Sequence, residues 1–116
     1  MSIERFPGSA RGRVRAVRHS GLVHAVATAQ SASGSVAEQT RLTLAALERN
    51  LLDAGSGKHR IVQATVYLAD MSTKAEMDAV WCEWIGGEEN WPQRACVGVA
   101  LAGDDLVEIV VTALAE

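Results

Sequence analysis

Hydrophobic and polar residues follow two different periods along this chain, and each period predicts a different kind of element. Alternation over residues 13–17 predicts a half-exposed edge strand, and the apolar run 22–28 after the Ser20-Gly21 turn predicts its hairpin partner. Further strands are predicted over 61–68, 94–101 and 106–114. Residues 1–12 show neither period, so we expect them to form an irregular arm.

Two segments have helical spacing instead. Ser35 and Glu38 are spaced as a capping box, and the helix that they open is expected to end at Gly55. Its apolar stripe consists of Leu44, Leu47 and Leu51. Thr73 and Glu76 predict a second capping box. The apolar positions of the second helix are Met77, Val80, Trp81, Trp84 and Ile85.

The order of these elements, β-β-α-β-α-β-β, predicts an α+β fold with two helices packed on one face of a mixed β-sheet. In the strand over 61–68, the residues expected to face the helices are Val62, Ala64, Val66 and Leu68, with Gln63, Thr65 and Tyr67 opposite. The last strand is largely apolar on both faces, which is typical of a strand buried on both sides. Because two helices cover one face only, we expect another copy of the protein to cover the second.

Length and charge narrow the class of protein. A chain of 116 residues is expected to form one domain, 1–116, and its net charge of −3 argues against a general nucleic-acid or membrane binder. No signal-peptide pattern is found, and Cys82 and Cys96 are too few for a secreted disulfide scaffold. The sequence therefore predicts a cytoplasmic protein. The three histidines are too scattered to predict a metal site.

Two apolar strands each carry one charged residue, Arg94 and Glu108. Arg94 shares a strand face with Cys96 and small residues, which leaves room for a carboxylate beside its guanidinium. The alternative interpretations of Arg94 are a structural salt bridge and a charge at an exposed strand end. In a tight hairpin of the last two strands, Arg94 and Glu108 would lie about 16 Å apart, so a direct pair is not expected. Either another strand lies between them, or the two charges meet different partners, including partners across a subunit boundary. Cys96 beside an arginine is a candidate thiolate, but a small buried side chain is the favoured interpretation.

Several motifs together resemble the Rid (YjgF) reactive-intermediate deaminase family. Pro92-Gln93-Arg94-Ala95-Cys96-Val97 is similar to its Pro-Ala-Arg strand, and Val107-Glu108-Ile109 to its Val-Glu-Ile strand. Further matches in order and spacing are Glu38-Gln39-Thr40, Leu44, Ala54-Gly55-Ser56, 61–71 and Trp81-Cys82-Glu83-Trp84. The resemblance implies a chorismate-mutase-like fold in a barrel-like homotrimer, with ligand sites between subunits. It also implies hydrolysis of 2-imino acids to 2-keto acids and ammonia, without metal or organic cofactor.

The resemblance also gives roles to individual residues. Arg94 matches the arginine that holds the substrate carboxylate, Glu108 the acid that orients water and moves protons, and Cys96 a cysteine lining the pocket. The family's Ser-Gly at the end of the second strand is replaced here by Val26-Ala27-Thr28, so Ala27 and Thr28 are expected at the substrate. The family's N-terminal Gly-Pro-Tyr is also missing, which indicates a divergent subgroup. Alternatives are a noncatalytic trimer that binds a keto acid and, more weakly, a ribonuclease or translation inhibitor.

Overall fold

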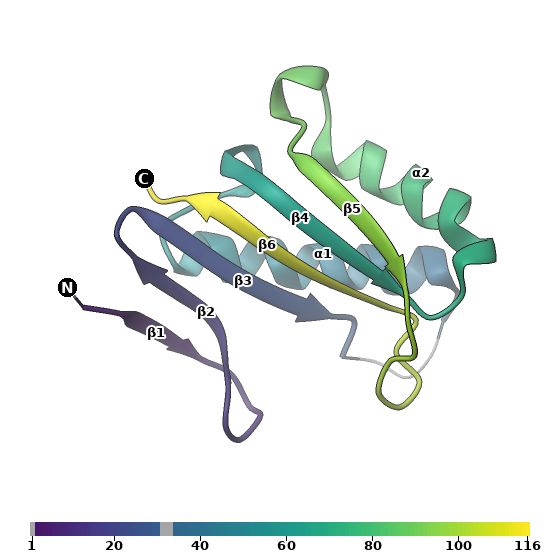
Figure 1. Cartoon of the computed structure of the whole chain (residues 1–116), viewed down its shortest axis with the longest axis horizontal. Helices are drawn as coiled ribbons and strands as arrows, with labels where there is room; N and C mark the ends of the chain where they lie inside the picture. Colours follow the sequence, from purple (N-terminus) through teal and green to yellow (C-terminus); the bar gives the residue numbers. More distant parts are fainter. Residues whose placement is uncertain (1, 31–33) are drawn as a thin grey trace.

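The chain forms two layers, a sheet and a pair of helices that covers one face of it (Figure 1). The computed structural model describes residues 2–30 and 34–116. The strands are β1 (Glu4–Pro7), β2 (Val14–His19), β3 (Leu22–Thr28), β4 (Ile61–Leu68), β5 (Gln93–Gly98) and β6 (Val107–Leu114). The helices are α1 (Val36–Asp53) and α2 (Lys74–Ile85). Three single 3₁₀ turns precede β4, α2 and β5, at Lys58–Arg60, Met71–Thr73 and Glu88–Asn90.

The six strands form one mixed sheet in the order β1-β2-β3-β6-β4-β5. Only β4 and β5 run parallel, joined through α2, and every other neighbouring pair is antiparallel. The predicted α+β fold, with two helices on one face of a mixed sheet, is therefore confirmed. Because β6 pairs with β3 and β4, the last two strands of the chain are not neighbours. Strand β5 lies at an edge of the sheet beside α2 (Figure 1).

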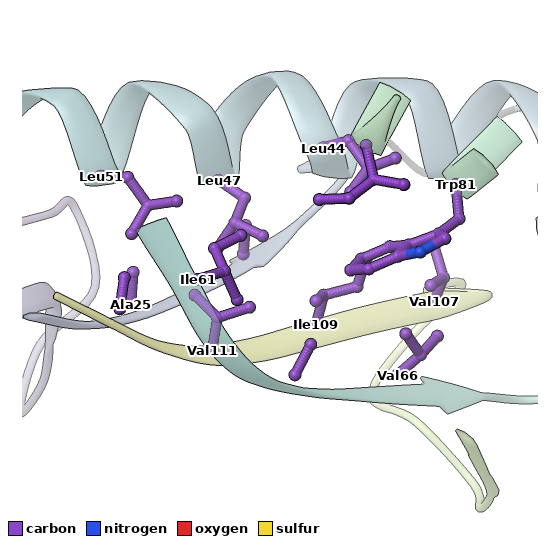
Figure 2. Packing of buried hydrophobic residues seen from close by; sticks show 14 of the residues in the cluster. Ala25, Leu44, Leu47, Leu51, Ile61, Val66, Trp81, Val107, Ile109 and Val111 are labelled. Atoms are coloured by element: carbon purple, nitrogen blue, oxygen red, sulfur yellow. The ribbon is translucent and has the colours of Figure 1, made fainter. Parts of the chain in front are cut away.

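The core lies between α1 and the sheet, with α2 closing one end. Ser35 begins α1 as predicted, since its Oγ accepts a hydrogen bond from the backbone N of Glu38. The stripe of Leu44, Leu47 and Leu51 is fully buried and points at the sheet (Figure 2). It meets the buried face of the central strands, which includes Ala25, Val66, Ile109 and Val111. No helix within the described residues is long and apolar enough to cross a membrane.

Two expectations for the N-terminal region are wrong. Part of the supposed irregular arm is strand β1, which pairs antiparallel with β2, so β2 is not the edge strand. A four-residue strand with two charged residues carries no readable alternation, and only the backbone pairing reveals it. A bulge at Arg15 also turns this side chain toward α1, where it forms an ion pair with Asp53 (2.9 Å). Arg15 thus helps to hold the N-terminal strands against α1.

Two further predictions, for Val62 and for the second capping box, are also wrong. Val62 is 44% exposed instead of facing the helices, because the register shifts between Ile61 and Gln63 and Ile61 takes the core position. The second capping box does not form. The Thr73 hydroxyl donates to the Asp70 carbonyl, and the Glu76 carboxylate accepts from the Ala37 backbone N (2.9 Å), which ties α2 to the first turn of α1. The sequence also predicts a loop over 31–34, most of which lies outside the described residues.

The face of the sheet away from the helices is uncovered by any described element. It presents apolar side chains from three strands, among them Val26, Val97, Val110 and Leu114. It also carries a polar cluster, in which the His19 and His24 Nε2 atoms lie 3.1 Å apart and His24 Nδ1 lies 3.1 Å from Thr112 Oγ1. The prediction that the last strand is apolar on both faces is confirmed. We call this surface the open face.

Candidate functional site

Arg94 lies near the start of the edge strand β5, on the side of the sheet that α2 covers. Its Nη2 donates a hydrogen bond to Asp78 Oδ1 at 2.6 Å, and its guanidinium carbon lies 5.3 Å from the centre of the Trp81 ring. Its Nη1 also lies 3.8 Å from the Met77 sulfur. With 18% of its side chain exposed, Arg94 is held between α2 and solvent. The lone charge in β5 is therefore paired, as the salt-bridge interpretation predicted.

Asp78 is held from two sides. Its Oδ2 accepts from Lys74 Nζ at 2.8 Å, one helical turn earlier, while its Oδ1 accepts from Arg94. Burial opposes ionisation of this carboxyl, but the hydrogen bonds and positive charges of Lys74 and Arg94 outweigh it and lower its pKa. Asp78 is therefore an anion at neutral pH, and the three side chains together carry one net positive charge.

The ion pair with Asp78 does not exhaust the donors of Arg94. A guanidinium presents N–H groups along two edges, and among the described residues only Nη2 is bonded to an oxygen. The contact of Nη1 with a thioether is weak, because sulfur is a poor acceptor. Arg94 therefore has donor capacity left for a carboxylate while it keeps its hydrogen bond to Asp78. The salt bridge and the carboxylate anchor are therefore compatible roles of one side chain.

Cys96 follows Arg94 on the same face of β5 and is partly buried. Burial raises the pKa of its thiol, and the positive charges of Arg94 and Lys74 offset this effect only in part, while Asp78 adds to it. Cys96 is consequently a neutral thiol at pH 7. This state fits a residue that lines a pocket and argues against a nucleophilic thiolate.

We expect this protonation state to show in alkylation kinetics. Iodoacetamide at pH 7.5 should label the exposed Cys82 roughly tenfold faster than Cys96, because alkylation needs an accessible thiolate. Intact-mass spectrometry of the Cys82→Ser and Cys96→Ser variants separates the two rates. Equal rates, or faster labelling of Cys96, would show an activated thiolate and contradict this description.

Glu108 lies in the middle of the sheet but on the open face. It is the register partner of Thr28 on β3 and of Tyr67 on β4, so these three side chains form a row across three strands. Among the described residues Glu108 has no hydrogen-bond or ion-pair partner. The predicted residue Ala27 points to the other side, where its methyl group belongs to the hydrophobic core. Of the two expected strand-end residues, only Thr28 accompanies Glu108.

Tyr67 is the member of this row that sequence reasoning did not choose as a site residue. The alternation of β4 assigned it correctly to the face away from the helices, but nothing in the sequence placed it beside Glu108. That neighbourhood depends on β4 pairing with β6 in one particular register, Tyr67 opposite Glu108. The row brings a phenol and a hydroxyl next to a carboxylate, a combination that can hold a water molecule and transfer protons.

Arg94 and Glu108 do not meet within one chain. Strand β4 lies between their strands, and along it their partners Ala64 and Tyr67 are about 10 Å apart. The two side chains also leave opposite faces of the sheet. The expectation that they do not pair directly is confirmed, although an intervening strand rather than hairpin register is the reason. Two hollows formed by described residues, one of about 480 Å³ near Gln39 and one of about 310 Å³ between α1 and α2, contain neither Arg94 nor Glu108.

This architecture is that of known YjgF-family structures. The crystal structure of NMB1025, a member of the YjgF protein family from Neisseria meningitidis, superposes with a TM-score of 0.92 at 36% identity, covering 100% of this chain and 97% of that one. Rv2704 from Mycobacterium tuberculosis, a member of the YjgF/YER057c/UK114 family, gives a TM-score of 0.86 at 28% identity, covering 97% and 99%. The fold therefore defines a YjgF-like protein.

Sequence comparison gives the family directly. The model of the endoribonuclease L-PSP family matches residues 8–115, and the chain belongs to this family. A RutC family protein of Haemophilus ducreyi is 40% identical over 77 residues, which is 66% of this chain and 65% of the relative. The RutC family protein PH0854 of Pyrococcus horikoshii is 36% identical over 90 residues, 77% of this chain and 70% of the relative. The chain thus spans about two thirds of the length of the curated relatives it matches.

Proposed function

We propose that this protein hydrolyses 2-imino acids to 2-keto acids and ammonia, in sites completed between the subunits of a homotrimer. The observation that carries the proposal is the guanidinium of Arg94, which is held by Asp78 and Trp81 and has N–H donors without an oxygen partner among the described residues. Family membership supports it, together with the row of Thr28, Glu108 and Tyr67 as a second polar group of the right chemistry.

The reaction makes modest demands on the protein. A protonated 2-imino acid has an electrophilic C2, so water adds to it once the substrate is anchored and the water is oriented. Glu108 accepts a proton from the attacking water, and Thr28 and Tyr67 hold that water with their hydroxyls. The C–N bond of the resulting carbinolamine then breaks as the nitrogen is protonated, which releases ammonia and leaves the 2-keto acid. No metal or organic cofactor enters this scheme.

The trimer is part of the proposal because one chain separates the two halves of the site. If the β5 edge of one subunit packs near the open face of the next, Arg94 of the first approaches Glu108 of the second. Three such head-to-tail contacts close into a ring, which also buries the apolar residues of the open face. The same contact therefore explains the exposed apolar surface and the divided site.

The test is to generate 2-iminopropanoate in situ with an amino-acid oxidase and to follow its decay. We expect the wild-type protein to accelerate the decay and Glu108→Gln to lower kcat roughly 100-fold, because the amide does not accept a proton. Glu83→Gln, a matched change on the exposed side of α2, should leave the rate unchanged.

The outcome also decides between the remaining functions. If the wild-type protein gives no acceleration but binds pyruvate, and Arg94→Ala abolishes that binding, the protein is a noncatalytic keto-acid binder and the hydrolase proposal is wrong. RNA cleavage that depends on Glu108 would favour a ribonuclease instead. We expect that outcome least, because the net charge is −3 and two arginines are already bound within the chain. Arg15 pairs with Asp53 of α1, and Arg18 donates to the backbone carbonyls of Ala54 and Glu116.

A further inference from the structure

Asp78 places a carboxylate directly beside the guanidinium on which the proposed substrate's own carboxylate would bind. Asp78 Oδ1 lies 2.6 Å from Arg94 Nη2, so a carboxylate bound to the other donors of Arg94 has Asp78 as a near neighbour. In a 2-imino or 2-amino acid the nitrogen is attached to the carbon next to the carboxylate. A ligand anchored on Arg94 with its C2 nitrogen turned toward α2 would bring this nitrogen within reach of Asp78.

Asp78 has the capacity to bind such a nitrogen. An ionised carboxylate accepts about four hydrogen bonds, and Asp78 uses one on each oxygen, from Lys74 and from Arg94. Its side chain is 31% exposed, so the remaining acceptor positions are open to a ligand. The charged side chains around it come from α2 and β5 only, Lys74 and Arg94 among the described residues, and both stabilise its anionic form.

We propose that Asp78 makes the Arg94 site selective for ligands that pair a carboxylate with a protonated nitrogen, and that it disfavours 2-keto acids. This inference rests on the proposed function, in which Arg94 anchors the substrate carboxylate. An iminium or ammonium group donates N–H to Asp78, so both ends of a zwitterionic ligand are matched. A keto oxygen at the same position has only lone pairs, which face the carboxylate and repel it.

The arrangement has a direct consequence for turnover. Hydrolysis replaces the C2 nitrogen, a donor, with an oxygen, an acceptor, so the product loses the contact with Asp78 that the substrate makes. Asp78 then acts as a specificity-determining residue that holds the imino acid and promotes release of the keto acid. Its position on α2, in the turn after Lys74, fixes it independently of the loops around the site.

Ligand binding to the Asp78→Asn variant tests the inference. Isothermal titration with pyruvate and with D- and L-alanine gives a ratio of affinities for the keto acid and for the better-bound zwitterion. We expect Asp78→Asn to shift this ratio at least roughly tenfold toward pyruvate, since the amide retains the shape and donates N–H to the keto oxygen. Asp53→Asn, which alters the Arg15–Asp53 ion pair away from the site, should leave the ratio unchanged. Lys74→Met keeps Asp78 and should preserve the zwitterion preference.

The outcomes separate this inference from the function on which it rests. If pyruvate binds, Arg94→Ala abolishes that binding and the ratio in Asp78→Asn stays within about twofold of wild type, the Asp78 inference is wrong and the carboxylate anchor stands. If Arg94→Ala binds every ligand as the wild type does, the anchor is wrong and both proposals fall. Far-ultraviolet circular dichroism of each variant checks that the fold is kept.

Discussion

Replacing Arg94 with methionine is expected to weaken pyruvate binding at least roughly 100-fold and to abolish imine hydrolysis. Each charge-assisted hydrogen bond to the guanidinium contributes about 1.5–3 kcal/mol to binding, and a bidentate carboxylate loses two of them. The variant also leaves the negative charge of Asp78 with Lys74 as its only partner, which repels an incoming carboxylate. Methionine is long enough to keep packing on Trp81, so the fold should persist.

Isothermal titration calorimetry with pyruvate and the imine decay assay measure this effect. Arg41→Met is the matched control, because Arg41 lies exposed on the outer side of α1 and its removal alters charge without touching the site. Urea unfolding of both variants separates binding from stability. Undiminished pyruvate binding by Arg94→Met would show that the carboxylate anchor lies elsewhere.

Replacing Val110 with aspartate is expected to dissociate the assembly. Val110 is 36% exposed in the middle of the open face, where its register partners are Val26 on β3 and Thr65 on β4. An unpaired carboxylate in a buried subunit interface costs several kcal/mol, and a ring of three copies incurs that cost at each contact. Imine hydrolysis should be lost as well, because in the proposed trimer Arg94 and Glu108 meet only across the subunit boundary.

Multi-angle light scattering at micromolar concentration gives the mass directly. The wild-type protein should show about three times the chain mass of 12.3 kDa, and Val110→Asp a single chain mass. Leu52→Asp is the control, since Leu52 is 60% exposed on α1 and should leave the assembly unchanged. A wild-type protein that is monomeric under these conditions would contradict both the trimer and the divided site.

Local pattern predicted the elements with strong periodicity. Residues 22–28 and 61–68 form strands with the predicted bounds, and the leucine stripe of α1 is buried as expected. The predictions failed at positions whose structure depends on contacts with another strand or helix and not on the local hydrophobic pattern. Strand β1 is too short and polar to show a period. The bulge after Ile61 places Ile61 in the core where Val62 was expected. Glu76 accepts a hydrogen bond from α1 instead of capping its own helix.

The sequence by itself singled out Arg94 and Glu108 as candidate functional residues. A lone charge in an apolar strand costs folding free energy unless it is paired or solvated. The sequence also showed that the last strand carries apolar residues on both faces, from which we predict cover beyond the two helices. The sequence did not reveal which residues lie next to each of the two charges. Helix α2 packs beside the edge strand β5, and this packing brings Asp78 to Arg94. Strand β4 lies between β5 and β6, and its register with β6 places Tyr67 opposite Glu108. These neighbours are distant in sequence and lie on different elements, and only strand order, strand register and the packing of α2, which are properties of the folded chain, bring them together.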